Sequence, residues 1–143
     1  MDSPSIESRV NDLLVEIYRS LLHYVSEAAY PWSDSHGTDL KQTVEQAAAR
    51  QEEDVHAIVD FLSARIPRVD FGVYPPEYTS LHFVAFSYLM DQLIASQKAV
   101  VEEIEAELPN LESDAEAHAL IQQVLDHQRE YLKSLESAGA ATA

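Results

Sequence analysis

Residues 111–137, LESDAEAHALIQQVLDHQREYLKSLES, decide the fold. Apolar side chains recur along this stretch at spacings of three and four residues, the period of one face of an α-helix. They are Ala117, Leu120, Ile121, Val124, Tyr131 and Leu135. A half-buried strand would alternate with a period of two, which this stretch does not do. The pattern predicts one long amphipathic helix that buries a single stripe.

Three more stretches show the same helical period, at residues 4–29, 38–66 and 79–108. The few Gly and Pro residues lie mainly between these stretches, where they interrupt the helical pattern. Four amphipathic helices of similar length bury their stripes against one another. The sequence therefore predicts an all-α protein in which residues 1–143 form a single four-helix bundle domain, with residues 138–143 as a frayed tail.

The connection at residues 67–78 leaves the topology open. Twelve extended residues reach about 40 Å, and a 27-residue helix is about 40 Å long as well. The connection can therefore cross the bundle from end to end, which makes the second and third helices parallel. Alternatively it turns back at once, which gives an up-down-up-down bundle.

Charge and composition restrict the possible partners. The chain has 25 acidic and nine basic side chains, a net charge of −16, so it should repel nucleic acids and anionic membranes. A basic protein partner is compatible with this charge. The absence of Cys excludes disulfides and thiolate metal sites. With no signal-peptide pattern and no apolar run long enough to span a bilayer, we expect a soluble cytoplasmic protein.

The second expected helix contains the Glu-x-x-His sequence Glu53-Asp54-Val55-His56. With the four-helix pattern, this motif resembles the ferritin-like superfamily, whose bundles use Glu-x-x-His to hold a di-iron or di-manganese centre. The stretch Gln128-Arg129-Glu130-Tyr131-Leu132 looks like the region where such proteins carry their second motif. The resemblance implies a ferritin-like bundle. It also implies an alternative function, a metal-binding protein or oxidoreductase that uses iron, manganese or zinc.

Helical geometry predicts where the motif points. If Val55 marks the centre of its stripe, Glu53 lies about 160° away on the solvent side and His56 about 100° away on a flank. In the last helix the inward positions are Gln128 and Tyr131, where the family has Glu and His. By this arithmetic no carboxylate faces inward, so the family's ligands do not carry over to this chain.

The core is expected to carry a layer of amides instead. Gln51, Gln97 and Gln128 lie within about 40° of their stripe centres and close to the middle of their helices. Tyr24, His82 and Tyr131 are expected to point inward as well. Buried amides need partners, because each unsatisfied group costs about 1–3 kcal/mol. Two interpretations follow: a hydrogen-bonded layer that fixes helix register, or a ligand-binding site formed by Gln51, Gln97, Gln128 and Tyr131.

Two His/Glu pairs offer an alternative metal site at the surface. His23 and Glu27 are four residues apart in the first helix, as are Glu52 and His56 in the second. With Glu53, these side chains could supply ligands to a metal ion from adjacent flanks. The other interpretation is two ordinary exposed helix pairs.

No recognisable catalytic constellation is present. The chain lacks a nucleophile elbow, a Gly-rich phosphate loop and a cluster of Lys or Arg. His118 and His127 lie on flanks of the last helix and are expected at the surface. We therefore expect a non-catalytic structural or interaction protein.

The third and fourth helices have wider apolar arcs than a bundle interior requires. The additional positions are Phe83, Met90, Ile94 and Val101 on one helix and Ile121, Leu125 and Leu132 on the other, with Phe71, Tyr74 and Tyr78 in the preceding connection. The arcs either pack two neighbours within one chain or leave an apolar patch. A patch predicts a homodimer, which salt should strengthen by screening the repulsion between chains.

Overall fold

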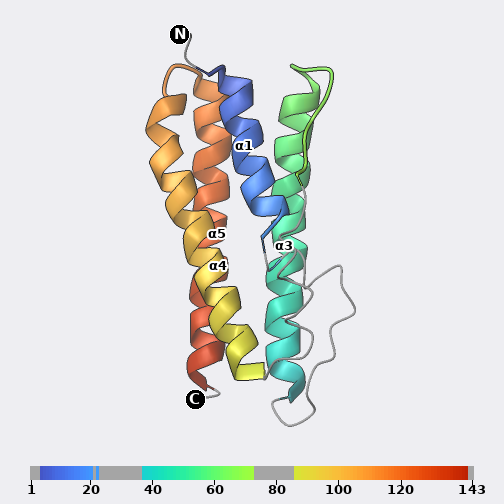
Figure 1. Ribbon diagram of the computed structural model, residues 1–143, viewed down its shortest axis with the longest axis vertical. Helices are drawn as coiled ribbons and strands as arrows, with labels where there is room; N and C mark the ends of the chain where they lie inside the picture. The colour runs from blue at the N-terminus through green and yellow to red at the C-terminus, as the bar shows by residue number, and fades with distance from the viewer. Residues whose placement is uncertain (1–3, 21, 23–36, 73–85, 142–143) are drawn as a thin grey trace.

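The computed structural model describes residues 4–20, 22, 37–72 and 86–141, and these ranges form an all-α four-helix bundle without strands (Figure 1). The helices are α1 (Ile6–Tyr18), α3 (Gly37–Ser63), α4 (Phe86–Glu107) and α5 (Ala115–Ala141), with a short 3-10 helix, η3 (Leu108–Leu111), before α5. The predicted fold class is therefore confirmed. None of the helices in these ranges combines the length and the hydrophobicity needed to span a bilayer.

Ion pairs at one end of the bundle establish the direction of each helix. Arg9, in the first turns of α1, pairs with Glu107 at the end of α4. Arg65, just after α3, pairs with Asp114, which precedes α5, and lies 3.7 Å from Glu7 of α1. The ends of α3 and α4 therefore lie together, and these two helices run parallel (Figure 1). Of the two topologies left open by the sequence, the end-to-end crossing is the one observed.

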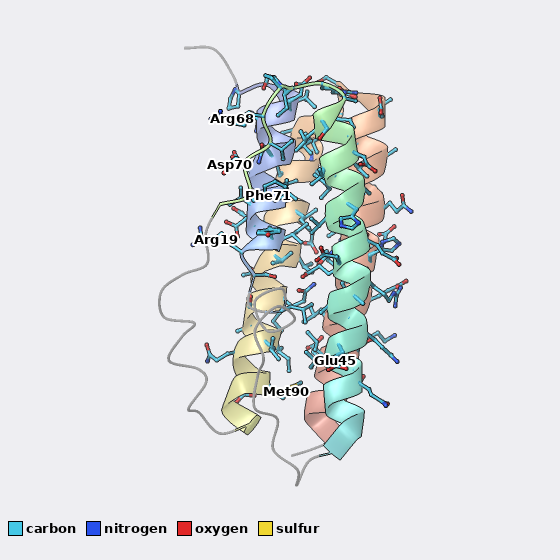
Figure 2. The ribbon with its side chains drawn as sticks, turned by 90° about the vertical axis from the view of Figure 1, so that its right-hand side faces the viewer. Arg19, Glu45, Arg68, Asp70, Phe71 and Met90 are labelled. Atoms are coloured by element: carbon cyan, nitrogen blue, oxygen red, sulfur yellow. The ribbon has the colours of Figure 1, made fainter. Side chains whose placement is uncertain are left out.

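The first part of the crossing connection follows the outer side of α1 (Figure 2). Asn11 donates to the Asp70 carbonyl at 2.6 Å and accepts from the Asp70 N–H at 3.0 Å. Further along, the rings of Phe71 and Tyr18 meet edge to face, 5.0 Å apart. The chain then turns at Gly72, whose φ of +72° favours glycine. These contacts direct the connection away from the end where α3 stops.

Two helix ends differ from the prediction. Instead of continuing to residue 29, α1 ends at Tyr18, where the Ser20 N–H bonds the Ile17 carbonyl and closes the last turn. No Gly or Pro marks this end, so the hydrophobic period could not locate it. At the other end of the chain, α5 continues through the expected tail to Ala141. Alanine has the highest helix propensity, which offsets the cost of about 1 kcal/mol for the single Gly139.

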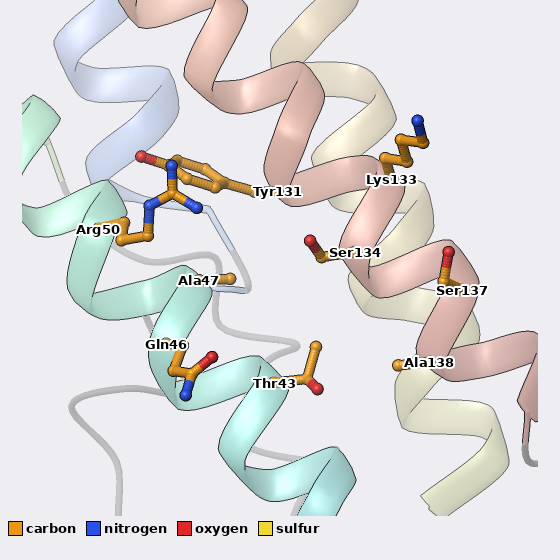
Figure 3. A pocket seen from close by; sticks show the side chains of 9 residues that line it. All are labelled: Thr43, Gln46, Ala47, Arg50, Tyr131, Lys133, Ser134, Ser137 and Ala138. Atoms are coloured by element: carbon orange, nitrogen blue, oxygen red, sulfur yellow. The ribbon is translucent and has the colours of Figure 1, made fainter.

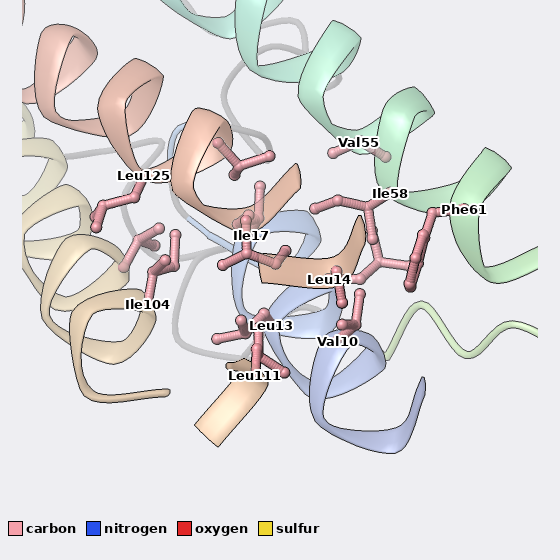
Figure 4. Close-up of a cluster of buried hydrophobic side chains, with 14 of the residues drawn as sticks. Val10, Leu13, Leu14, Ile17, Val55, Ile58, Phe61, Ile104, Leu111 and Leu125 are labelled. Carbon is pink, nitrogen blue, oxygen red and sulfur yellow. The ribbon is translucent and has the colours of Figure 1, made fainter. Parts of the chain in front are cut away.

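The apolar core joins all four helices (Figure 4). Its buried members include Leu14 and Ile17 of α1, Ile58 of α3, Ile104 of α4 and Ile121 of α5, each fully inaccessible to solvent. These residues belong to the predicted stripes or flank them directly. Because every helix contributes to one continuous cluster, the four predicted faces meet as expected.

The wide arcs of α4 and α5 pack two neighbours within the chain. Met90, Val101, Ile121 and Leu125 are all buried. For these four residues, packing within one chain is therefore the alternative that holds. Ile94 and Leu132 are half-buried. Phe83, Tyr74 and Tyr78 lie outside the described residues.

Candidate functional site

Three glutamines meet in the middle of the bundle as predicted. Gln51 of α3, Gln97 of α4 and Gln128 of α5 are completely buried. The Gln128 Oε1 atom accepts one hydrogen bond from Gln51 Nε2 and one from Gln97 Nε2, both at 2.9 Å. Gln97 Nε2 also donates to the Gln128 backbone carbonyl at 3.0 Å. Gln128 is therefore the centre of the layer.

Longer contacts complete the layer on the side of α1. Gln51 Nε2 lies 3.5 Å from Gln97 Oε1, and the Ser20 hydroxyl donates to Gln51 Oε1 at 3.5 Å. Each amide oxygen of the three glutamines thus has a donor within the layer. Such mutual pairing satisfies the need for buried partners. It supports the register-fixing interpretation and leaves these amides little capacity for a ligand.

The layer also contains a buried carboxylate that the sequence arithmetic missed. The side chain of Asp54 on α3 is only 6% exposed, so the expectation of no inward carboxylate is wrong. Its Oδ2 atom accepts from Gln128 Nε2 at 3.0 Å and from the Tyr131 hydroxyl at 2.8 Å. Its Oδ1 atom lies 2.7 Å from His127 Nδ1. Burial raises the pKa of Asp54, and the hydrogen bonds from His127 and Tyr131 oppose that rise.

His127 is the second correction to the predicted site. It was expected at the surface without a partner, but its side chain is one-third exposed and its Nδ1 atom contacts Asp54. Because an ionised carboxylate only accepts hydrogen bonds, this contact places the proton on Nδ1 when the ring is neutral. The carboxylate therefore fixes both the orientation and the tautomer of the imidazole.

Tyr131 connects this buried cluster to the surface of the bundle. It is buried as predicted, and its hydroxyl bonds Asp54, while the Arg50 guanidinium lies 5.2 Å from the centre of its ring. Burial and the hydrogen bond to Asp54 both raise the pKa of Tyr131, so the hydroxyl stays protonated and donates. Arg50 in turn pairs with Glu130 at 2.8 Å.

A signal for Asp54 and His127 was present in the sequence. Asp54 is three residues after Gln51 and four before Ile58, and His127 is three residues after Val124 and four before Tyr131. Both therefore share a helix face with buried neighbours. They were missed because each helix was treated as having one buried stripe.

Those expected metal ligands that the structure describes, Glu52, Glu53 and His56, do not form a metal site. Glu53 and His56 are exposed, and His56 Nε2 lies 3.6 Å from Glu52 Oε1 as an ordinary surface pair. His23, Glu27, Tyr24 and His82 fall outside the described residues. Within the described part of the chain, no three His, Asp or Glu side chains are arranged to hold a metal ion. Because Glu53 and His56 are exposed, they do not fit the di-metal centre inside the bundle that the ferritin-like resemblance implied.

Comparison of the chain with protein-family models, with curated proteins and with solved structures gives no match.

Proposed function

We propose that this chain is a non-catalytic structural or interaction protein that self-associates. The observation that carries the proposal is the internal pairing of its buried polar groups. Asp54 accepts from His127, Gln128 and Tyr131, and Gln128 accepts from Gln51 and Gln97. These groups join α3, α4 and α5 in one register and direct their polar atoms at one another. A polar core that fixes helix register is a known structural use of such groups.

The seam between α4 and α5 is the proposed self-association surface. The hydrogen bond between Gln97 and Gln128 aligns the two antiparallel helices. Ile94 and Leu132 lie one turn from these glutamines on the same side along the bundle, and both are half-buried. Leu108, the first residue of η3, is also half-buried and extends the apolar character toward that end of the bundle. Partly covered apolar side chains on one seam favour contact with a second copy through a symmetric interface.

Sedimentation equilibrium of the full chain at about 50 mM and about 500 mM NaCl tests this proposal, because high salt screens the repulsion between acidic chains. We expect a dimer that strengthens at the higher salt concentration. Ile94→Gln should weaken it, whereas Val59→Gln, at a half-buried position on α3, is the matched control. A monomer at both salt concentrations and tens of micromolar protein contradicts self-association.

A ferritin-like metal-binding protein is the second candidate. The parallel arrangement of α3 and α4 supports it, because ferritin-like bundles contain one long crossover connection. Metal analysis of protein purified without chelator separates the two proposals. The leading proposal predicts no stoichiometric iron, manganese or zinc. A stoichiometric metal that is lost in Glu53→Gln or His56→Ala would favour the second candidate.

A further inference from the structure

The imidazole of His127 is held in a fixed orientation at the surface of the bundle. Its Nδ1 atom lies 2.7 Å from Oδ1 of Asp54, whose side chain is buried. The other oxygen of Asp54 accepts hydrogen bonds from Gln128 and Tyr131, so the carboxylate cannot turn away from the ring without losing two buried bonds. Because the Nδ1 edge faces this carboxylate, the exposed third of the His127 side chain lies on the rest of the ring, which carries Nε2.

The tautomer makes Nε2 the nucleophilic atom of His127. A proton on Nδ1 leaves the lone pair of the neutral ring on Nε2. None of the described residues forms a hydrogen bond or ion pair with Nε2. The ionised carboxylate of Asp54 also increases the basicity of the imidazole to which it is bonded. In hydrolytic triads a buried carboxylate does the same, because it orients an imidazole and stabilises the positive charge that forms on it.

The surroundings of His127 favour a neutral reaction partner that arrives from bulk solvent. The groove of about 540 Å³ between α3 and α5 includes Tyr131 and Arg50 in its lining but not His127 (Figure 3). Arg50 lies over the Tyr131 ring and is already paired with Glu130, so it offers no free charge to an anion. Asp126 and Glu130 are exposed on the same helix as His127, and the chain has a net charge of −16. An anionic donor is therefore repelled.

We propose that His127 is a modification site whose Nε2 atom takes the acyl group of a neutral acyl donor. Nε2 attacks the carbonyl carbon, the leaving group departs with the electrons of its bond to that carbon, and the Nδ1 proton passes to solvent. The ring is positively charged while the new bond forms, and the Asp54 carboxylate stabilises this charge. Asp54 is thus a positioning residue for the reaction.

Acylation of His127 carries a surface event into the polar layer. A substituent on Nε2 leaves Nδ1 of the neutral ring without a proton, so a lone pair then faces Oδ1 of Asp54. Asp54 keeps Gln128 and Tyr131 as donors but loses the third. Because a buried carboxylate that loses a donor is destabilised, the acylated bundle should unfold more easily than the unmodified one.

Carbethoxylation of the full chain with diethyl pyrocarbonate at pH 8, followed by peptide mass spectrometry, tests the site. Ordinary imidazoles are neutral at this pH, so the rates compare nucleophilicity. His118 is the matched control, because it is half-buried like His127 and no described residue bonds its ring. His56 is the control for exposure, because its side chain is 71% exposed and would react first if exposure alone decided the rate.

We expect His127 to react faster than His118 and His56. Asp54→Asn should slow the reaction of His127 about tenfold, as expected for loss of a charge-assisted hydrogen bond in the transition state, and leave His118 unchanged. The chain modified at His127 should have a lower urea midpoint, which hydroxylamine should restore by removing the acyl group. His127→Gln treated in the same way should show no such shift.

Two results would overturn the proposal. If His127 reacts no faster than His118, Asp54 does not activate Nε2. If full modification of His127 leaves the urea midpoint unchanged, the acyl group does not disturb the layer. Both measurements use the wild-type chain, so they decide the proposal even if Asp54→Asn does not fold.

Discussion

Asp54→Ala tests whether the buried carboxylate holds the polar layer together. Asp54 accepts hydrogen bonds from the Gln128 amide, the Tyr131 hydroxyl and the His127 ring. Alanine removes all three acceptor contacts at once. His127 is one-third exposed and can bond water, but Gln128 and Tyr131 are buried and lose their partner.

The expected cost follows from these two buried donors. Each buried donor left unsatisfied costs about 1–3 kcal/mol, so the pair costs about 2–6 kcal/mol. Removing the carboxylate also removes the cost of its own burial, which offsets part of that loss. We therefore expect Asp54→Ala to lower the free energy of unfolding by about 3 kcal/mol.

Urea unfolding followed by circular dichroism at pH 7 measures this difference. Asp60→Ala is the matched control, because Asp60 is an exposed carboxylate on the same helix. Exposed substitutions of this kind change stability by about 0.5 kcal/mol or less. If Asp54→Ala costs no more than Asp60→Ala, the hydrogen bonds of Asp54 do not stabilise the bundle and the structural role proposed for the layer is wrong.

Three further predictions concern the same core and the crossing connection. Burial raises the folded-state pKa of Asp54 above its ordinary value of 3.8, so the folded state binds a proton more readily than the unfolded state. The stability contributed by Asp54 should therefore increase as pH falls from the folded pKa toward 3.8. Urea unfolding between pH 7 and pH 4 should show this gain in the wild type and not in Asp54→Asn. Gln128→Leu should destabilise the bundle more than Gln97→Leu in the same assay. Gln97→Leu should cost about 1 kcal/mol, because Gln128 Oε1 keeps the Gln51 amide as a donor, whereas loss of Gln128 leaves several groups unpaired. Equal losses would contradict the central role of Gln128. Gly72→Ala should lower stability by about 1–2 kcal/mol in thermal unfolding, because φ is +72° and the new Cβ would lie 2.7 Å from Val15 Cγ1; Val15→Ala should recover only the part due to the clash.

The sequence was sufficient to predict the four helices and the glutamine layer. Apolar residues at spacings of three and four are required wherever a helix packs on a core, so Leu93, Ile104 and Ile121 could be recognised without the structure. The same arithmetic placed Gln97 and Gln128 inside, because each lies close to the centre of a strong stripe.

Asp54 and His127 were missed for a physical reason. A single stripe centre describes a helix with one neighbour, but α3 packs against both α1 and α5. Its buried arc is therefore wider than the stripe around Val55, and Asp54 falls within that arc. The direction of the crossing connection was undetermined for another reason, because an extended chain of its length and a helix of this bundle have about the same reach.

The crossing connection separates the chain into two antiparallel helical hairpins, α1 with α3 and α4 with α5. The polar layer lies between them: Ser20, Gln51 and Asp54 come from the first hairpin, and Gln97 and Gln128 from the second. Two copies of the chain can therefore exchange hairpins through their connections. In such a domain-swapped dimer, each first hairpin would meet the second hairpin of the other copy. The hydrogen bonds of Gln51 and Asp54 with Gln128 would then be re-formed between chains, whereas the Gln97–Gln128 bonds would stay within one chain.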